Sequence, residues 1–412
     1  MKILVVSQYF RPETFAINGW VQSLRDHGAE VTVLTGQPNY PDGKIFPGYS
    51  AWKIGREKSG DVDVRRVPLV PRGQSSAVRL ALNYLSFVFS GALFGPWLLR
   101  GQRFDVVFVY GTSPILQALP AIVLGWIKRA PVAIWVQDLW PESLSATGFI
   151  KNKTLLAAVS SVVRLIYRAS AAILIQSRAF REPIERLIGK SAKFHYFPNS
   201  VEPPAGAAPS PAAAEAAQII EKRFSVVFAG NLGVAQSLDT MLDAAELLKE
   251  NGDIVFQIVG SGSRDGWIAG EIERRKLPNV FMRGRFPFQD MPPILQAASA
   301  LLVSLKDEPI FAYTVPNKIQ AYLAAGRPIV AALNGEGARL VEEAGAGVAC
   351  AAEDAKGLAD AVMRLYSMSG AERAALGDAG RRYFMEHFES GKLTDQLLGL
   401  FDQLKQKGNR QQ

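Results

Sequence analysis

The chain has 412 residues, enough for two globular domains, and 48% of them are hydrophobic, which excludes an intrinsically disordered protein. The single cysteine, Cys350, cannot form an internal disulfide, so we expect a protein of a reducing compartment, the cytoplasm. The net charge of +8 is unevenly spread, because residues 1–200 carry 24 Lys and Arg against 12 Asp and Glu. This basic half fits an anionic membrane surface better than nucleic acid, since no nucleic-acid-binding motif is visible.

The first half of the chain alternates short apolar runs with helical stretches. Strands are predicted at Ile3–Ser7, Glu30–Thr35, Val62–Val67, Asp105–Val109, Val132–Gln137, Ala172–Gln176 and Lys193–Phe197, with helices between them that include Ile17–His27, Ile115–Lys128 and Leu155–Tyr167. Continuous rather than alternating apolar character is typical of a parallel sheet covered by helices on both faces. Residues 1–200 are therefore predicted to form a doubly wound α/β domain.

One segment within this half, Leu80–Leu99, has the length of a membrane-spanning helix and carries no charge. Asn83, two glycines and Pro96 interrupt it, and it lies between two predicted strands of one sheet. Three interpretations stay open: a buried or partly exposed helix of the domain, a helix inserted shallowly beside the basic surface, and a true span. Near an anionic leaflet each Lys or Arg contributes about 1 kcal/mol, so a few suffice for reversible docking.

From Pro198 to Pro211 the composition changes to Pro and Ala with few large apolar side chains, which is typical of a linker; we place it at residues 201–222. The alternation then resumes, with strands predicted at Arg223–Ala229, Ile254–Val259, Val280–Arg283, Ala300–Ser304, Pro328–Ala332 and Val348–Cys350, helices at Leu238–Glu250 and Asp354–Tyr366, and terminal helices near Ala371–His387 and Lys392–Lys405. The fold class is thus α/β, with two doubly wound parallel-sheet (Rossmann-like) domains. Such domains bind ligands in a cleft at the carboxyl ends of their strands.

Candidate binding residues of the first domain follow two of its predicted strands, Ile3–Ser7 and Val132–Gln137. The loop Gln8–Gly19 lacks the G-x-G-x-x-G pattern of dinucleotide-binding domains, which argues against a dehydrogenase. Asn18 and Gly19 lie at its end, where Gly19 serves either close approach of a ligand or helix entry. Asp138 and Glu142 follow a buried strand, and we assign them to catalysis, although Glu142 equally suits a helix start.

Candidate anion-binding residues are concentrated in the second domain. Glycine-containing turns follow two of its strands and expose backbone amides, as at Gly230–Gly233 and Gly260–Gly262. A helix predicted to begin near Pro316 carries Lys318 in its first turn, where phosphates bind readily. We assign to substrate binding Gly230, Asn231, Gly233, Gly262, Arg264, Arg285, Lys306, Glu308, Pro316, Asn317 and Lys318.

No metal site is predicted. Asp61 and Asp63 match the spacing of the metal-binding carboxylate pair of one class of sugar transferases, but they lie in an alternating strand whose charges are expected to face solvent. The three histidines are scattered, without ligand spacing. We therefore assign no metal and no cofactor.

Several motifs occur in the order seen in bacterial family 4 glycosyltransferases. They are MKILVVSQYFRPE, VTVLTGQPNYPDGKI, VQDLWPES, the strand–glycine turn at Ala229–Gly233, IVGSGS and VPNKIQAYLAAGRPIV. The chain most resembles the subgroup that builds O-antigen and colanic-acid-type polysaccharides, including L-fucosamine transferases. The resemblance implies the GT-B fold, a nucleotide-sugar donor held by residues 223–388, an acceptor held by residues 1–200, and retention at the anomeric carbon without a metal. It also implies that the helix in residues 389–412 packs back on the first domain.

The chain departs from the broader family at two pairs of positions. Tyr313 and Ala321 stand where the family carries glutamates that contact hydroxyls of the donor, and Asn231 and Gln236 stand where it carries a basic pair. The resemblance then implies that the diphosphate charge falls mainly on Lys318.

The expected function is transfer of a sugar, such as N-acetyl-fucosamine, from a UDP-linked donor to a lipid-linked or lipopolysaccharide acceptor at the cytoplasmic membrane. Two alternatives stay open. One is a non-catalytic partner subunit docked at the membrane, suggested by the missing glutamates. The other is a sugar-nucleotide epimerase on the same fold.

Overall fold

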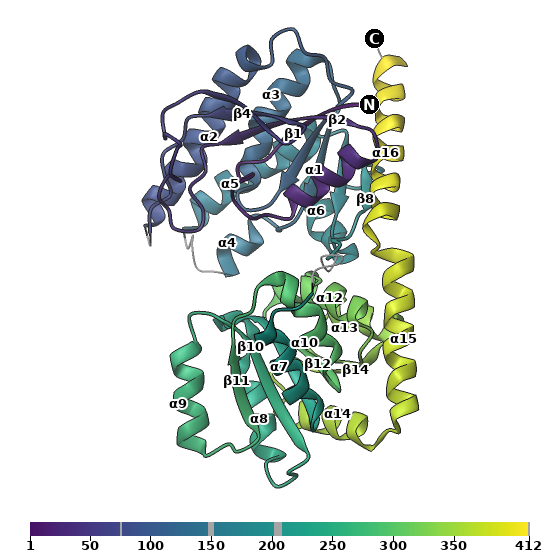
Figure 1. The fold of residues 1–412 in the computed structure, drawn as a ribbon. Helices are drawn as coiled ribbons and strands as arrows, with labels where there is room; N and C mark the ends of the chain where they lie inside the picture. Colours follow the sequence, from purple (N-terminus) through teal and green to yellow (C-terminus); the bar gives the residue numbers. More distant parts are fainter. Residues whose placement is uncertain (75, 147–151, 202–207, 411–412) are drawn as a thin grey trace. The chain divides into compact units, whose positions relative to one another are not determined.

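The computed structural model describes residues 1–74, 76–146, 152–201 and 208–410, and the chain divides into two compact units. Unit 1 comprises Met1–Pro198 and Gly391–Gln412, and unit 2 comprises Asn199–Ser390 (Figure 1). Each unit is a sheet of parallel strands, with one antiparallel edge strand in unit 1, and helices cover both faces, which confirms the predicted α/β class with two Rossmann-like domains.

The sheet of unit 1 has eight strands in the order β3-β4-β2-β1-β5-β6-β7-β8. They are β1 (Lys2–Val6), β2 (Glu30–Gly36), β3 (Gly55–Ser59), β4 (Val62–Val67), β5 (Val106–Gly111), β6 (Val132–Val136), β7 (Ala172–Ile175) and β8 (Phe194–Tyr196). All neighbours are parallel except β3, which forms a polar antiparallel edge with β4. Sequence reasoning missed β3 because Gly-Arg-Glu-Lys-Ser contains no apolar residue, as is common in edge strands.

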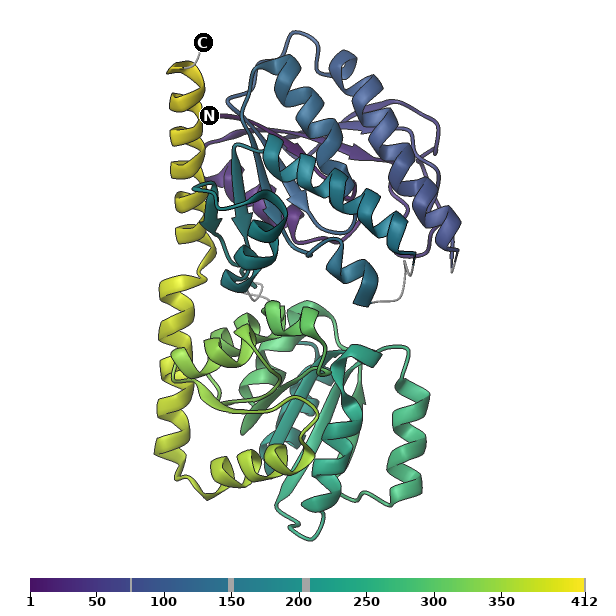
Figure 2. The same cartoon turned by 180° about the vertical axis from the view of Figure 1, so that it is seen from behind.

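Two layers of helices cover this sheet. The helices of unit 1 are α1 (Ile17–Asp26), α2 (Ala77–Leu98), α3 (Ala118–Lys128), α4 (Glu142–Ala146), α5 (Lys153–Ala169), α6 (Arg181–Ile188) and α16 (Ser390–Arg410). Apolar side chains of α1 and α16 share one core with alternate residues of β1, β2 and β5. Helices α2, α3 and α5 pack beside one another on the opposite face (Figure 2).

The carboxyl-terminal helix belongs to unit 1 from Gly391 onward. Its Phe401 ring lies 5.3 Å from the ring of Phe108 in β5, between centroids. The hydroxyls of Thr394 and Ser23 are 2.7 Å apart, and the ammonium of Lys405 lies 3.0 Å from the Asp105 carboxylate. The chain therefore returns to its first domain after completing the second.

The sheet of unit 2 is wholly parallel, in the order β11-β10-β9-β12-β13-β14. Its strands are β9 (Phe224–Asn231), β10 (Ile254–Ser261), β11 (Val280–Gly284), β12 (Ala300–Ser304), β13 (Ile329–Ala332) and β14 (Gly347–Cys350). The strand order reverses between β9 and β12. In open parallel sheets, ligands bind beyond the carboxyl ends of the strands at such a reversal.

Helices cover both faces of this sheet as well. They are α7 (Pro211–Glu221), α8 (Leu238–Leu247), α9 (Asp265–Arg275), α10 (Met291–Gln296), α11 (Pro309–Tyr313), α12 (Asn317–Ala325), α13 (Glu336–Glu343), α14 (Ala355–Ser367) and α15 (Gly370–His387). The prediction of a linker over 201–222 is wrong for the part that forms α7. Ala213, Ala216 and Ile220 of α7 are buried in the core of unit 2, and the Ser210 hydroxyl caps the helix. The Pro- and Ala-rich composition typical of a linker ends at Pro211, and the alanines that follow favour a helix that packs closely.

Candidate functional site

A cavity of about 740 Å³ lies at the reversal point of the unit 2 sheet, beyond the carboxyl ends of β9 and β10. It is lined by Val201, Ala229, Gly230, Asn231, Val259, Gly260, Ser261, Gly262, Arg285, Phe286, Phe288, Met291, Leu295, Asn317, Lys318, Ala321 and Tyr322. Polar and cationic groups come from the strand ends and from the start of α12. The volume and this mixed lining are those of a small-molecule site.

Two glycines bring the backbone of β9 and β10 close together at the cavity. Gly230 has φ +142°, and a Cβ atom there would lie 2.5 Å from Cε of Lys318. Gly260 has φ +143°, and its Cβ would lie 1.8 Å from the carbonyl oxygen of Gly230. Any larger residue would push the two turns apart. Their glycines thus shape a tight, backbone-lined wall around the Lys318 side chain.

Lys318 is the cation at the centre of this wall. Its ammonium donates a hydrogen bond to Oε1 of Gln236 and lies 3.7 Å from the ring centroid of Phe228. Burial lowers the pKa of Lys318 from 10.5 to about 7. An anion strongly stabilises the charged form of a buried amine that has few polar partners, because it replaces the stabilisation that water would otherwise give.

The start of α12 adds backbone donors beside Lys318. The helix begins at Asn317, directly after Pro316, so the amides of Asn317 and Lys318 precede the first carbonyl that the helix could offer them, whereas the Ile319 amide donates to the Pro316 carbonyl at 2.9 Å. Nδ2 of Asn199 donates to Oδ1 of Asn317 at 2.9 Å and fixes that side chain. Helix-start amides and a lysine together form a site for phosphate oxygens.

Tyr322, which lines the cavity, connects α12 to the strands beneath it. Its buried hydroxyl accepts a hydrogen bond from the amide of Ala229 at 3.0 Å and lies 3.2 Å from the carbonyl oxygen of Leu302. The side chain thereby ties α12 to β9 and β12. Lys318, Ala321 and Tyr322 are spaced three and four residues apart, so they share the face of α12 that meets the cavity. Sequence reasoning did not select Tyr322, although its spacing from Lys318 indicates that both lie on one face of the helix.

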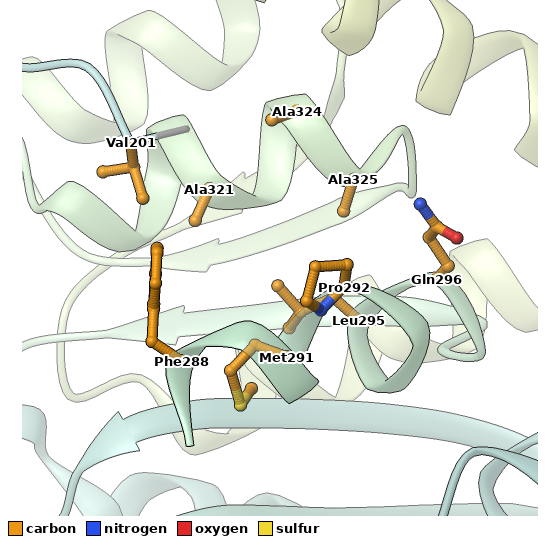
Figure 3. A pocket seen from close by; sticks show the side chains of 9 residues that line it. All are labelled: Val201, Phe288, Met291, Pro292, Leu295, Gln296, Ala321, Ala324 and Ala325. Atoms are coloured by element: carbon orange, nitrogen blue, oxygen red, sulfur yellow. The ribbon is translucent and has the colours of Figure 1, made fainter. Parts of the chain in front are cut away.

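The other end of the cavity is apolar. Figure 3 shows an adjoining apolar pocket that shares Phe288, Met291, Leu295 and Ala321 with the cavity. In it, Phe288 and the side chains of α10 face the small side chains of α12. Sequence reasoning named no residue of α10, since MPPILQ reads as ordinary core. The site therefore combines a cationic, amide-rich end with an apolar end, as a molecule carrying both a charged group and a flat or apolar group requires.

The predicted binding residues of unit 2 divide into two groups. The structure brings Gly230, Asn231, Gly262, Arg285, Asn317 and Lys318 together around the cavity. Gly233, Arg264, Lys306, Glu308 and Pro316 are not among the residues that line it.

Arg264 shows why the second group falls outside. Its guanidinium lies 3.2 Å from the Asp239 carboxylate and 3.6 Å from the ring centroid of Trp267. The charge is thus neutralised locally, so the structure offers no support for a role in holding the ligand. Loop residues next to the site in sequence can point away from it in space.

In unit 1, the predicted catalytic residues follow β6. The amide of Ser113 donates to Oδ2 of Asp138 at 3.0 Å, and Nε1 of Trp140 donates to the Ser113 hydroxyl at 2.9 Å. Burial raises the pKa of Asp138, and the Ser113 hydrogen bonds oppose that rise. One carboxylate oxygen of Glu142 is buried without a hydrogen-bond partner among the described residues. Both carboxylates thus lie after the carboxyl end of β6, and their catalytic role stays a prediction.

The loop before α1 is organised by a carboxylate that sequence reasoning did not select, Glu13. It accepts hydrogen bonds from the amides of Asn39 and Tyr40 at 2.8 and 2.7 Å. Nδ2 of Asn18 donates to the Glu13 carbonyl at 2.7 Å, so the Asn18 side chain is turned toward its own loop. A Cβ at Gly19 would meet no atom within 4 Å, so that position is open.

Residues 15–200 match the family described as glycosyl transferase 4-like domain, and residues 223–368 match the family described as glycosyl transferases group 1. The putative colanic acid biosynthesis glycosyl transferase WcaI of Escherichia coli (strain K12) is 26% identical over 342 residues, covering 79% of this chain and 82% of the relative.

Solved structures of similar fold cover nearly the whole chain. Sucrose-phosphate synthase from Thermosynechococcus elongatus superposes with a TM-score of 0.75 at 16% identity, covering 98% of both chains. Anabaena Alr3699/HepE in complex with UDP and glucose has a TM-score of 0.68 at 15% identity, covering 98% of this chain and 100% of the other. The two family matches together span most of the sequence, and the fold agrees, so the chain is a glycosyltransferase of the GT-B type with a family 4-like amino-terminal domain.

Proposed function

We propose that the enzyme transfers a sugar from a nucleoside-diphosphate donor, bound in the unit 2 cavity, to a lipid-linked or lipopolysaccharide acceptor during the synthesis of a cell-surface polysaccharide. The observation that carries this proposal is the position of Lys318 between the glycine turns and the first amides of α12. A diphosphate is the part of the donor that such a site would hold. A structure of similar fold contains UDP and glucose, which supports UDP as the nucleotide.

In the proposed reaction, negative charge accumulates on the departing diphosphate as the sugar–phosphate bond breaks. Donors already in position stabilise that charge without reorganisation. Lys318 and the amides at the start of α12 would do so here, and Arg285 lines the same cavity. We infer retention at the anomeric carbon, without a metal and without a nucleophile from the protein.

We propose an N-acetylated deoxyhexosamine, such as N-acetyl-fucosamine, as the transferred sugar. The resemblance to L-fucosamine transferases motivates this choice. Ala321 also supports this choice of sugar, because it makes the cavity wall apolar at the position where the broader family carries a carboxylate. A sugar with a methyl group in place of a hydroxyl would leave fewer buried hydroxyls unsatisfied against such a wall.

For unit 1 we propose the acceptor site, with Asp138 orienting the acceptor hydroxyl. The relative named for colanic acid biosynthesis supports a role in polysaccharide synthesis, and we propose that the acceptor glycan is carried on a lipid. Such an acceptor would place the enzyme at the cytoplasmic face of the membrane.

The test is a donor screen. Purified protein is incubated with UDP- and GDP-sugars and a membrane lipid extract, and transfer to lipid is followed with labelled sugar. Sugar transfer from a UDP-linked donor supports the proposal. A folded protein that binds UDP but turns over no donor would instead be a non-catalytic partner subunit, and conversion of donor without acceptor would indicate an epimerase.

A further inference from the structure

Helix α2 exposes a row of large apolar side chains, whereas most residues of its buried face are small or polar. Asn83, Phe87, Ser90, Gly91 and Gly95 are buried toward unit 1. The outward residues recur every three or four positions and are Val78, Leu82, Leu85, Phe89, Leu93 and Trp97. Their exposed fractions run from 46% for Leu85 to 72% for Phe89. Single exposed apolar residues are ordinary, but a continuous stripe of six along one helix indicates a covered surface.

This helix is fixed to its domain and cannot leave it to span a bilayer. Nε2 of Gln8 donates to Oδ1 of Asn83 at 2.6 Å, and Nδ2 of Asn83 donates to the carbonyl of Val70 at 2.7 Å. A Cβ at Gly91 would lie 3.0 Å from Pro120 of α3, so the two helices are in close contact. In hydrocarbon these hydrogen bonds would be lost without replacement. Although α2 is the one described helix long and apolar enough to cross a membrane, its packing favours contact along one side.

Helices α3 and α5 extend the apolar face. They lie beside α2 in the same layer, on the side of the sheet that faces away from α16 (Figure 2). Trp126 of α3 is 82% exposed, and Leu165 of α5 is 58% exposed. Val123, Ile127 and Leu155 are exposed as well. We call the outward side of these three helices the α2–α3–α5 face.

The charges of this face all have one sign. Helices α2, α3 and α5 contain no Asp or Glu, whereas Arg79, Lys128, Lys153, Arg164 and Arg168 lie on them. The helices on the other side of the sheet, α1 and α16, carry both signs. Helix α6, which packs against α5 at the edge of this face, carries both signs as well.

Basic and aromatic residues meet where α2 ends. The guanidinium of Arg56 lies 5.3 Å from the Trp97 ring, and Arg100 follows the helix directly. Tryptophan with neighbouring arginine is the combination that settles at the headgroup level of a bilayer. An apolar stripe with cations at its edges therefore matches both the interior and the anionic surface of a membrane.

We propose that the α2–α3–α5 face docks on an anionic bilayer, with α2 parallel to the membrane and its stripe at the boundary between headgroups and acyl chains. A second copy of the chain fits this face less well. In a symmetric dimer the same surface meets itself, and the cations would then face cations without any carboxylate from these helices. The inference rests on the proposed function in one respect, since a lipid-carried acceptor gives docking its purpose.

The test is sedimentation of the full chain with vesicles of 70% phosphatidylcholine and 30% phosphatidylglycerol, compared with phosphatidylcholine alone. The double variant Phe89→Gln/Leu93→Gln removes two stripe residues, and Leu247→Gln/Met385→Gln changes two exposed apolar residues of unit 2 as the matched control. We expect the stripe variant to lower the vesicle partition coefficient at least tenfold and the control to leave it within twofold. The variant Arg79→Gln/Arg100→Gln should weaken binding to the anionic vesicles and lessen its dependence on salt.

Equal vesicle binding by the stripe variant and the parent would overturn the proposal, as would a parent protein that binds no vesicles. A parent that is dimeric in the absence of lipid, and that the stripe variant converts to monomers, would show that a second copy occupies the face. UDP affinity is measured on every variant. Lost vesicle binding with unchanged UDP affinity isolates the docking face from the donor site, so that either claim can fail without the other.

Discussion

Replacing Lys318 by methionine should weaken binding of UDP about 10- to 150-fold. A hydrogen bond to a charged group contributes about 1.5–3 kcal/mol, which corresponds to that range of affinities. The methionine side chain has nearly the same length, so it keeps contact with the Phe228 ring while removing the charge. A variant on the surface of α14, Lys356→Met, is the control, because Lys356 is exposed and pairs with Asp360.

The same substitution should not destabilise the folded protein. Burial lowers the pKa of Lys318 from 10.5 to about 7, so between these values the unfolded chain holds one more proton than the folded chain. The free energy of unfolding should therefore rise with pH from about 7 to about 10.5 in the parent, and Lys318→Met should lack this contribution. Denaturant unfolding at several pH values measures it.

Binding of UDP should depend on pH in the opposite direction. Below about pH 7 the Lys318 amine is already charged in the empty site, whereas above it the ligand must bind together with a proton. The affinity of the parent should then fall by up to about tenfold per pH unit above 7, relative to Lys318→Met. Isothermal titration calorimetry in buffers of different ionisation enthalpy detects the proton uptake. Unchanged UDP affinity in Lys318→Met, with the fold intact, would refute the role of this lysine.

Three further substitutions test the rest of the site. Gly230→Ala would place a methyl group 2.5 Å from Cε of Lys318 at φ +142°, so UDP affinity should fall at least tenfold in calorimetry; wild-type affinity would contradict the close approach. Tyr322→Phe removes the hydroxyl that serves the buried Ala229 amide, so the free energy of unfolding should fall by about 1–3 kcal/mol in denaturant titrations, and no loss would show that the bond is dispensable. Asp138→Asn should lower sugar transfer at least tenfold while leaving UDP affinity unchanged, and equal transfer rates would remove Asp138 from the acceptor site.

Much of the fold followed from the sequence, because its strands are continuously apolar and end in recognisable turns. The strands of both sheets were found in this way, except the polar β3. Proline before α12 and glycine after it marked that helix correctly. Alanine-rich α7 was misassigned, since composition alone does not separate a linker from a helix that packs through small side chains.

Less of the site could be predicted, because a sequence does not show where a side chain points. Lys318 and Gly230 line the cavity, whereas Arg264 lies near them in the fold and pairs with Asp239. The apolar end formed by α10 comes from residues that resemble ordinary core. Similarly, apolar composition identified α2 as a helix without showing that its large side chains face outward and its glycines inward.

Sugar transfer from a nucleoside-diphosphate donor tests the central claim most directly. Purified enzyme is supplied with radiolabelled UDP-N-acetyl-fucosamine and membrane lipid extract, beside the Lys318→Met variant. We expect labelled lipid with the parent and a rate at least tenfold lower with the variant. Equal labelling by both proteins would contradict the proposal that the Lys318 cavity holds the donor.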